Sequence, residues 1–385
     1  MFNHKKNLVI VTDNFLPRRD GVVSFLNEII PRLKSQFHIT VICPDSKERV
    51  SMSGVKFVRI PLSKKVFGDF QFAKFRPSKM VRAIRKSDIV FSQTIGPIGG
   101  TGLFLGQTFN KKTVSFIHSI EWELFTKAIN HRTLKRHVGP LTKRMVRFLY
   151  NRCDQLIVPS EQVSELLLSQ RIDVSRSVIH LGVDPNRFKP LEDRDLRIKE
   201  RERLGLQMDD FVIGYHGRLS REKDIFTLLR AFVHLKKTNP RFKLLIVGSG
   251  LPDIVEKLAR REGVVHIPAT QHVERYLPLM DLYVTPSLTE TTSLSTLEAM
   301  SCELPLVTTK AGYIRDYVTE GKNGLFFPMK NSIVLAKKIL YLAKRKSQRD
   351  LFGKNARETV LERFDWDKTA SKLDDFFKEL TSDKL

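Results

Sequence analysis

The sequence has 385 residues, 41% of them hydrophobic, which is enough for two domains with cores of their own and typical of a soluble globular protein. No window approaches the roughly 18 consecutive apolar residues of a membrane-spanning helix, and the three scattered cysteines exclude a disulfide framework and indicate a reducing compartment. The formal net charge of +24 predicts an anionic partner.

The positive charge is concentrated in the first half of the chain. Residues 1–190 contain 32 basic and 14 acidic side chains, whereas the remaining residues contain 34 and 28. We therefore expect the first half of the chain to bind the anionic partner. An anionic membrane and nucleic acid are the two broad candidates.

The chain opens with an apolar run that ends at Thr12, too early for a signal peptide, so we expect a buried strand there. A helix with periodic apolar residues follows, and Gly21 lies where the loop turns into it. A glycine lets the backbone approach a ligand closely, and a helix N-terminus favours phosphate. A plain strand-to-helix turn is the alternative.

Strands and helices then alternate, which predicts a parallel sheet with helices on both faces. The glycine-rich residues 96–106 lack the G-x-G-x-x-G spacing of a dinucleotide site, so we interpret them as close helix–strand packing. His118 follows a predicted strand at its carboxyl end, where open α/β sheets bind ligands. A structural role for this lone histidine is the alternative.

Two basic segments account for the charge excess. The first begins at Lys64 and ends at Lys86, with eight basic residues against Asp69 alone and several phenylalanines between them. The second begins at Leu124 and ends at Arg152, with eight basic residues and no acidic one.

The second basic segment contains a helical pattern with two interpretations. Its apolar positions on one face are Leu141, Met145, Phe148 and Leu149. The helix is either an ordinary core-facing one with a solvated basic back, or an interfacial segment on an anionic leaflet, where each basic residue contributes about 1 kcal/mol.

The second half follows a charged stretch, residues 189–210, which we expect to connect two domains and to include a surface helix. It opens with a strand, a loop carrying Gly217, Arg218 and Lys223, and a helix. Two fixed cations in one loop can bind and neutralise an anionic group such as a phosphate.

Residues 282–307 predict another strand, loop and helix. Glu290 lies in the loop and Glu298 inside the helix, and either carboxylate can accept hydrogen bonds from sugar hydroxyls. The backbone N–H groups that can hold an anion at the helix start belong to Thr292, Ser293, Leu294 and Ser295.

The pattern Glu290-x7-Glu298, followed by Ala299-Met300, Cys302 and Pro305, resembles the signature of the family 4 retaining glycosyltransferases of the GT-B fold. The resemblance implies an α/β protein with two Rossmann-like domains whose parallel sheets face an interdomain cleft. It implies an acceptor domain over residues 1–188, a nucleotide-sugar donor domain over 189–360, and a helix over 361–385 that crosses back to the first domain.

The resemblance also implies roles for individual residues. Glu290 and His118 contact the transferred sugar, Glu298 contacts the ribose of the donor, and Arg218 and Lys223 bind the diphosphate. The catalytic set is His118, Glu290, Arg218 and Lys223, and the donor-binding set is Gly21, Gly217, Arg218, Lys223, Glu290, Thr292, Ser293, Leu294, Ser295 and Glu298. The family usually has Gly-Phe-Gly where this chain has Thr291-Thr292-Ser293, so the identity of the sugar is open.

The implied reaction transfers a hexose from a nucleoside diphosphate sugar to a lipid or lipid-linked acceptor, with retention and without a metal ion. We expect a cytoplasmic protein held peripherally on the membrane through the two basic segments. The alternatives are a glycosyltransferase for a soluble acceptor or polysaccharide, and a non-catalytic nucleic-acid-binding protein on a GT-B scaffold.

Overall fold

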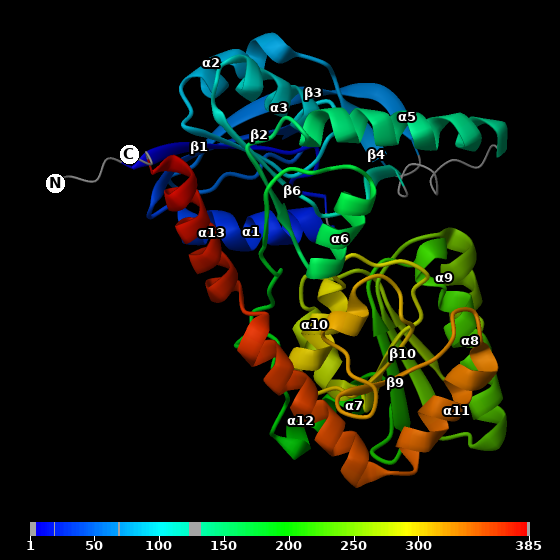
Figure 1. The fold of residues 1–385 in the computed structure, drawn as a ribbon. Coiled ribbons are helices and arrows are strands. Elements are labelled where there is room, and N and C mark those ends of the chain that lie inside the picture. Colours follow the sequence, from blue (N-terminus) through cyan, green and yellow to red (C-terminus); the bar gives the residue numbers. More distant parts are fainter. Residues whose placement is uncertain (1–4, 19, 68–69, 123–131, 383–385) are drawn as a thin grey trace. The chain divides into compact units, whose positions relative to one another are not determined.

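The computed structural model describes residues 5–18, 20–67, 70–122 and 132–382, in two compact units (Figure 1). Unit 1 consists of Met1–Leu181 and Trp366–Leu385, and unit 2 of Gly182–Asp365. Each unit is built on its own β-sheet with helices packed against it.

The described part of unit 1 contains an eight-stranded sheet in the order β4-β3-β2-β1-β5-β6-β7-β8. Neighbouring strands are parallel except β3 and β4, which are antiparallel. The central strands are almost wholly apolar because parallel strands are buried on both faces. The strands are β1 (Lys6–Val11), β2 (Phe37–Asp45), β3 (Lys56–Phe67), β4 (Phe70–Ala73), β5 (Ile89–Ser92), β6 (Lys112–Phe116), β7 (Gln155–Val158) and β8 (Arg176–Val178).

The last helix of the chain belongs to unit 1, where it packs against the first helix. Arg32 on α1 pairs with Asp367 on α13 at 2.6 Å, and the rings of Phe25 and Trp366 lie 6.1 Å apart. The helices of this unit are α1 (Gly21–Leu33), α2 (Pro77–Arg85), α3 (Gly99–Thr108), α5 (Arg132–Tyr150), α6 (Glu161–Ser169) and α13 (Trp366–Thr381).

The glycine-rich residues 96–106 run through the loop before α3 into the helix itself, which packs closely on the sheet. A Cβ atom at Gly102 would lie 2.7 Å from the side chain of Val11, and one at Gly106 would lie 2.7 Å from Thr113. The interpretation of this segment as close helix–strand packing is confirmed.

The described part of unit 2 contains a six-stranded sheet in the order β11-β10-β9-β12-β13-β14, with all pairs parallel. Alternate residues of a strand point to opposite faces, so Ile213 and Val212 of β9 lie in two different hydrophobic clusters. Helices therefore cover both faces. The strands are β9 (Phe211–His216), β10 (Phe242–Val247), β11 (Val264–Ile267), β12 (Leu282–Thr285), β13 (Leu306–Thr308) and β14 (Gly324–Phe326).

The two faces of this sheet carry different helices. Buried residues of α8, α9 and α11 belong to one cluster and those of α10 to the other, whereas α12 contributes Phe352 to the first and Ala356 and Val360 to the second. The helices are α7 (Arg194–Arg203), α8 (Ile225–Thr238), α9 (Pro252–Ala259), α10 (Leu294–Ser301), α11 (Ser332–Ala343) and α12 (Lys346–Arg363). Short 3-10 turns are η1 (Arg221–Lys223), η2 (Val273–Arg275), η3 (Leu277–Leu279) and η4 (Ile314–Asp316).

The boundaries between the units differ from the expected 188/189 and 360/361. Unit 2 begins at Gly182 because Val183 donates its N–H to Phe364 O at 2.7 Å and Phe188 is buried in the unit 2 core. It ends at Asp365, the residue before α13.

The charged stretch before β9 contains the expected surface helix, but the whole stretch belongs to unit 2 and does not connect the two units. The helix is α7, whose Arg197 and Arg201 both pair with Asp281, at 2.9 and 2.8 Å. The Arg201 side chain is buried, and it also donates to Leu279 O at 2.7 Å. This helix is therefore fastened to the body of unit 2.

Candidate functional site

The candidate site in unit 2 lies where the loops after β9 and β12 meet. These two strands are neighbours in the sheet, so their carboxyl ends share one edge, and helices leave them toward opposite faces. A backbone hydrogen bond connects the two loops, since Leu288 N donates to Glu222 O at 2.8 Å. Residues far apart in the sequence are thus brought together.

Lys223 and Glu290 are in direct contact across the two loops. Lys223 Nζ lies 2.6 Å from Glu290 Oε1, which also accepts a hydrogen bond from the Ser287 hydroxyl at 2.7 Å. Their side chains are 20% and 7% exposed. The cation and the carboxylate therefore hold a fixed geometry instead of moving freely in water.

Arg218 precedes Lys223 in the same loop and contacts a different carboxylate. Its guanidinium pairs with Glu222, and the two side chains are 52% and 31% exposed. Burial acts to raise the pKa of Glu222, but the neighbouring Ser220 and the positive charge of Arg218 hold this pKa below its ordinary value. Glu222 was not singled out from the sequence.

Glycines allow the loop backbones around these residues to touch. Gly217 has φ +133°, a conformation that favours glycine, and a Cβ atom at Gly248 would lie 1.9 Å from Gly217 O. A Cβ atom at Gly312 would lie 1.7 Å from Glu290 O. Gly217 and Glu290 are therefore held by backbone contacts that no larger residue permits.

The start of α10 forms one side of this site. Ser293 is the N-cap residue, yet its side chain does not cap the helix; its hydroxyl instead lies 3.1 Å from that of Ser295 and accepts from Thr296 at 2.9 Å. Thr292 is half-buried, and Leu294 packs against the hydrophobic core. The first-turn N–H groups of such a helix suit an anion.

Glu298, in the next turn of α10, contacts a residue that sequence reasoning missed. His216 Nε2 lies 2.6 Å from Glu298 Oε2. The available signal was the position of His216 as the last residue of a strand, directly before Gly217 and Arg218, where ligands of α/β sheets bind.

In unit 1, Gly21 is the first residue of α1, and the preceding Asp20 caps the helix by accepting from Val23 N at 3.0 Å. Nothing lies within 4 Å of a Cβ atom placed on Gly21, so this glycine is not required by packing. Open space of this kind suits the approach of a ligand to the helix start.

His118 follows β6 in unit 1 and is held by neighbouring side chains. Its Nε2 lies 2.8 Å from Gln93 Oε1, and its ring stacks on Phe116 with centroids 4.4 Å apart. Burial lowers the pKa of His118 to about 3, so the imidazole is neutral at physiological pH and can exchange hydrogen bonds without carrying charge.

The two basic segments also belong to unit 1, and parts of each, residues 68–69 and 124–131, lie outside the described residues. In the first segment, Phe75 is exposed between Lys74 and Arg76. In the second, α5 presents Leu141, Met145 and Phe148 at 70%, 44% and 52% exposure. The core-facing interpretation is wrong for these three residues and holds for Leu149.

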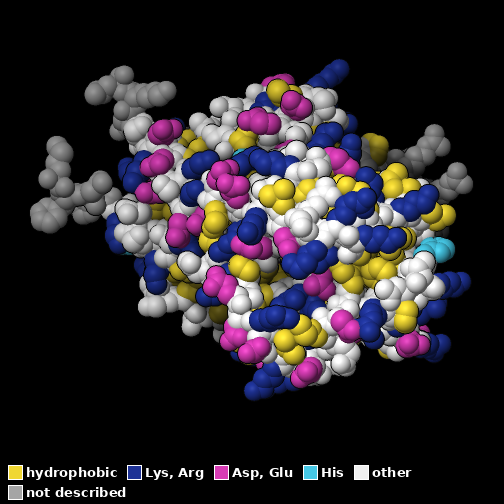
Figure 2. All heavy atoms as spheres, turned by 90° about the horizontal axis from the view of Figure 1, so that it is seen from below, with side chains coloured by type: hydrophobic (Ala, Val, Ile, Leu, Met, Phe, Trp, Pro, Cys, Tyr) yellow, Lys and Arg dark blue, Asp and Glu magenta, His cyan; other side chains and the backbone are white. Residues whose placement is uncertain are grey.

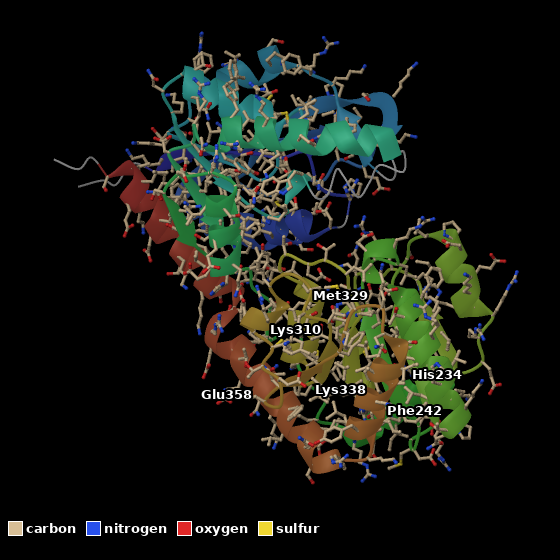
Figure 3. The ribbon with its side chains drawn as sticks, turned by 45° about the vertical axis from the view of Figure 1, so that its right-hand side comes forward. His234, Phe242, Lys310, Met329, Lys338 and Glu358 are labelled. Carbon is tan, nitrogen blue, oxygen red and sulfur yellow. The ribbon has the colours of Figure 1, made fainter. Side chains whose placement is uncertain are left out.

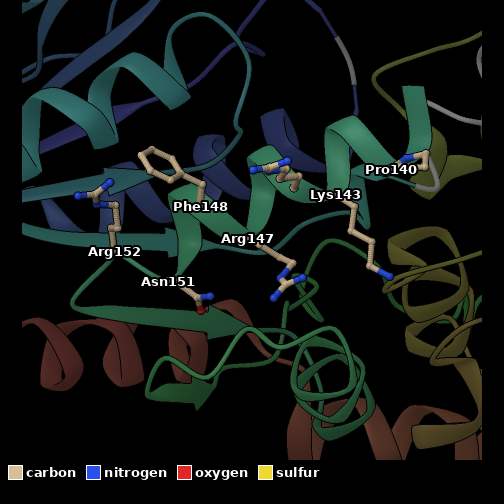
Figure 4. A pocket seen from close by; sticks show the side chains of 7 residues that line it. Pro140, Lys143, Arg147, Phe148, Asn151 and Arg152 are labelled. Carbon is tan, nitrogen blue, oxygen red and sulfur yellow. The ribbon is translucent and has the colours of Figure 1, made fainter. Parts of the chain in front are cut away.

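The exposed face of α5 combines apolar and basic side chains (Figure 4). An open hollow of about 620 Å³ on it is lined by Pro140, Lys143, Arg144, Arg147, Phe148, Asn151 and Arg152. Among the described residues, no helix has the length and apolar character needed to cross a bilayer.

Two family models match the chain. Glycosyltransferase Family 4 matches residues 19–187, and Glycosyl transferases group 1 matches residues 197–359. The first match falls almost wholly within unit 1, and the second within unit 2.

Individual relatives agree with these matches. The alpha-monoglucosyldiacylglycerol synthase of Acholeplasma laidlawii is 24% identical over 366 residues, 90% of each chain. The GDP-mannose-dependent alpha-(1-6)-phosphatidylinositol monomannoside mannosyltransferase of Mycolicibacterium smegmatis is 28% identical, over 82% of this chain and 84% of that protein. The crystal structure of Anabaena HepE in complex with UDP and glucose has a TM-score of 0.78 at 20% identity, over 97% of this chain and 100% of that one. The chain therefore belongs to the family 4 glycosyltransferases, and its two parallel-sheet units are those of the GT-B fold.

Proposed function

We propose that this glycosyltransferase transfers a hexose from a nucleoside diphosphate sugar to a membrane lipid, with retention at the anomeric carbon. The observation that carries the proposal is the contact of Lys223 Nζ with Glu290 Oε1 at 2.6 Å, beside the start of α10. A cation and a helix N-terminus suit a diphosphate, and a carboxylate suits sugar hydroxyls.

Each residue has a role in the proposed reaction. Lys223 and Arg218 bind the diphosphate and neutralise the charge that develops as it leaves, with the N–H groups at the start of α10. Glu290 and the neutral His118 hold the hydroxyls of the transferred sugar, and Glu298 holds the ribose. The backbone at Gly21 approaches the diphosphate.

The proposed bond changes need neither a protein nucleophile nor a metal ion. The bond from the anomeric carbon to the diphosphate breaks, and the acceptor oxygen forms its bond to that carbon on the same face. The acceptor proton passes to a diphosphate oxygen. The two cations supply the charge that a metal ion supplies in other transferases.

The donor is proposed to be a UDP- or GDP-hexose. The Anabaena HepE crystal structure holds UDP and glucose, and the Mycolicibacterium smegmatis relative is named for GDP-mannose. The Acholeplasma laidlawii relative is named for a glucosylated diacylglycerol and the Mycolicibacterium smegmatis relative for a phosphatidylinositol mannoside, which supports a lipid acceptor.

The exposed face of α5 supports a peripheral position on an anionic leaflet, which we propose to be the cytoplasmic one. Leu141, Met145 and Phe148 recur at the spacing of one helical face, and the exposed Arg144 lies next to this face and lines the hollow with Phe148. Apolar side chains that enter the headgroup region and cations that meet lipid phosphates are the two components of interfacial binding.

The test is transfer of labelled hexose from UDP-glucose and GDP-mannose to vesicles that contain diacylglycerol or phosphatidylinositol, with a chelator present. We expect an α-linked glycolipid and release of the nucleoside diphosphate. Transfer to soluble glycans alone would contradict the lipid acceptor, and inhibition by the chelator would contradict metal independence. Absence of both transfer and hydrolysis, with tight binding of nucleic acid, would favour the non-catalytic alternative.

A further inference from the structure

His216 and Glu298 form a buried contact at the edge of the candidate site. His216 is the last residue of β9, and its Nε2 lies 2.6 Å from Glu298 Oε2 on α10. The histidine side chain is 5% exposed and the carboxylate 26%, so the histidine stands behind the carboxylate and not in solvent.

Tyr283 on β12 fixes the position of His216. Its hydroxyl donates to His216 O at 3.0 Å and accepts from His216 N at 3.3 Å, and the two rings lie 5.4 Å apart. The contact therefore ties together β9, β12 and α10.

The surroundings of the ring determine which nitrogen carries the proton. Among the described residues, the buried Nδ1 atom of His216 has no hydrogen-bond partner. A carboxylate accepts hydrogen bonds and does not donate them, so the ring nitrogen next to Glu298 Oε2 carries a proton. The proton therefore lies on Nε2, which donates to Glu298 Oε2.

We propose that His216 is a positioning residue that holds the Glu298 carboxylate for the ribose diol of the donor nucleotide. This inference rests on the proposed function. A carboxylate on a helix can rotate about three side-chain torsions, and a hydrogen bond from a rigid, buried imidazole restricts them. With Oε2 held by His216, the carboxylate presents Oε1 to a ribose hydroxyl. His216 thereby sets the preference for a ribose over a deoxyribose.

The experiment compares the binding of UDP and GDP with that of their 3′-deoxy analogues by calorimetry. For the nucleotide that the wild-type protein binds, we expect the ribose form to bind about tenfold more tightly than its 3′-deoxy analogue. This is the gain expected from one hydrogen bond to a charged group. In His216→Leu, this preference should fall to near unity, with a raised KM for the donor and a kcat within about threefold.

His216→Gln keeps an N–H donor near the position of Nε2 and should restore most of the preference. His234 is exposed on α8, so His234→Leu is the matched control and should behave as wild type (Figure 3). An unchanged preference in a folded His216→Leu protein would overturn the inference alone. Failure of the wild type to bind any of these nucleotides would overturn the proposed function, and the inference with it.

Discussion

At the scale of single residues, each candidate diphosphate-binding cation already holds a carboxylate. Lys223 contacts Glu290, and Arg218 contacts Glu222. A diphosphate competes for both cations because it concentrates more negative charge than one carboxylate. The Lys223 pair is the less exposed, so its Coulombic interaction is less screened by water and salt.

Lys223→Met should reduce kcat/KM by about 100-fold or more, because it removes a fixed cation where the leaving diphosphate gains charge. Steady-state transfer kinetics measure the effect. Lys338 is labelled in Figure 3 and pairs with Glu320, outside the candidate site, so Lys338→Met is the control. Equal activities of the two variants would contradict the role of Lys223.

Glu121 predicts a pH dependence of stability in unit 1. Burial raises the pKa of Glu121 from 4.5 to about 7, although Tyr150 donates to it at 2.7 Å. The folded state therefore holds this proton more tightly than the unfolded state, and stability falls as pH rises from about 4.5 to about 7.

Glu121→Gln keeps the acceptor for Tyr150 and removes the ionisation. The difference in free energy of unfolding, variant minus wild type, should be more positive at pH 8 than at pH 5. The change in this difference is on the order of 3 kcal/mol. Urea unfolding at both pH values measures this, with the exposed Glu165→Gln as the control. A constant difference between Glu121→Gln and wild type would show that Glu121 does not titrate in this range.

At the scale of elements, the two basic helices α5 and α7 use their positive charge differently. On α5, basic side chains accompany an exposed apolar row, which we attribute to membrane binding. On α7, Arg197 and Arg201 point to Asp281 and fasten the helix to unit 2.

Met145→Ser combined with Phe148→Ser should weaken binding to anionic vesicles, measured by flotation, by about thirtyfold or more and leave the melting temperature unchanged. The loss follows from removing two exposed apolar side chains, each worth on the order of 1 kcal/mol or more at an interface. Met329 in unit 2 is 44% exposed, as is Met145, so Met329→Ser is a matched control (Figure 3). Unchanged flotation of the double variant would remove α5 from the membrane contact.

Asp281→Asn should destabilise the protein by about 3 kcal/mol, because it leaves the buried Arg201 without its charged partner. Denaturant unfolding measures the change. Arg203→Ala, at an exposed pair with Glu200, is expected to cost less than about 1 kcal/mol. Similar losses in the two variants would argue against the anchoring role of α7.

At the scale of the whole molecule, the charge is distributed unevenly along the chain. Residues 1–190 carry 32 basic and 14 acidic side chains, and the rest carries 34 and 28. On the face shown in Figure 2, basic and acidic side chains are interspersed. Long-range attraction to an anionic surface is therefore expected to come mainly from the first half of the chain.

Flotation with anionic vesicles should be strong at 50 mM salt and largely lost at 1 M, where the screening length falls to about 3 Å. Neutral vesicles should bind weakly at both concentrations. Nucleotide binding at the more enclosed Lys223 should change less over this range, which calorimetry can measure. Salt-independent flotation would show that the charge of the first half does not drive membrane binding.

Patterns local in the sequence predicted the fold class and the family, and both predictions are confirmed. Alternating apolar strands and helices predicted a parallel sheet, and the spacing of Glu290 and Glu298 carried the resemblance to the family. The individual roles of the site residues stay predictions, although the structure places Lys223 against Glu290.

The sequence by itself determined the two α/β units, the order of the candidate residues along the chain and the basic excess of the first half, because each depends on composition or on short-range periodicity. Tertiary structure decided that His216 lies behind Glu298, that Arg201 is buried against Asp281, and that three apolar residues of α5 face outward. These facts depend on which strand edges and helix faces meet in space. Helical periodicity shows which residues share a face but not what that face contacts.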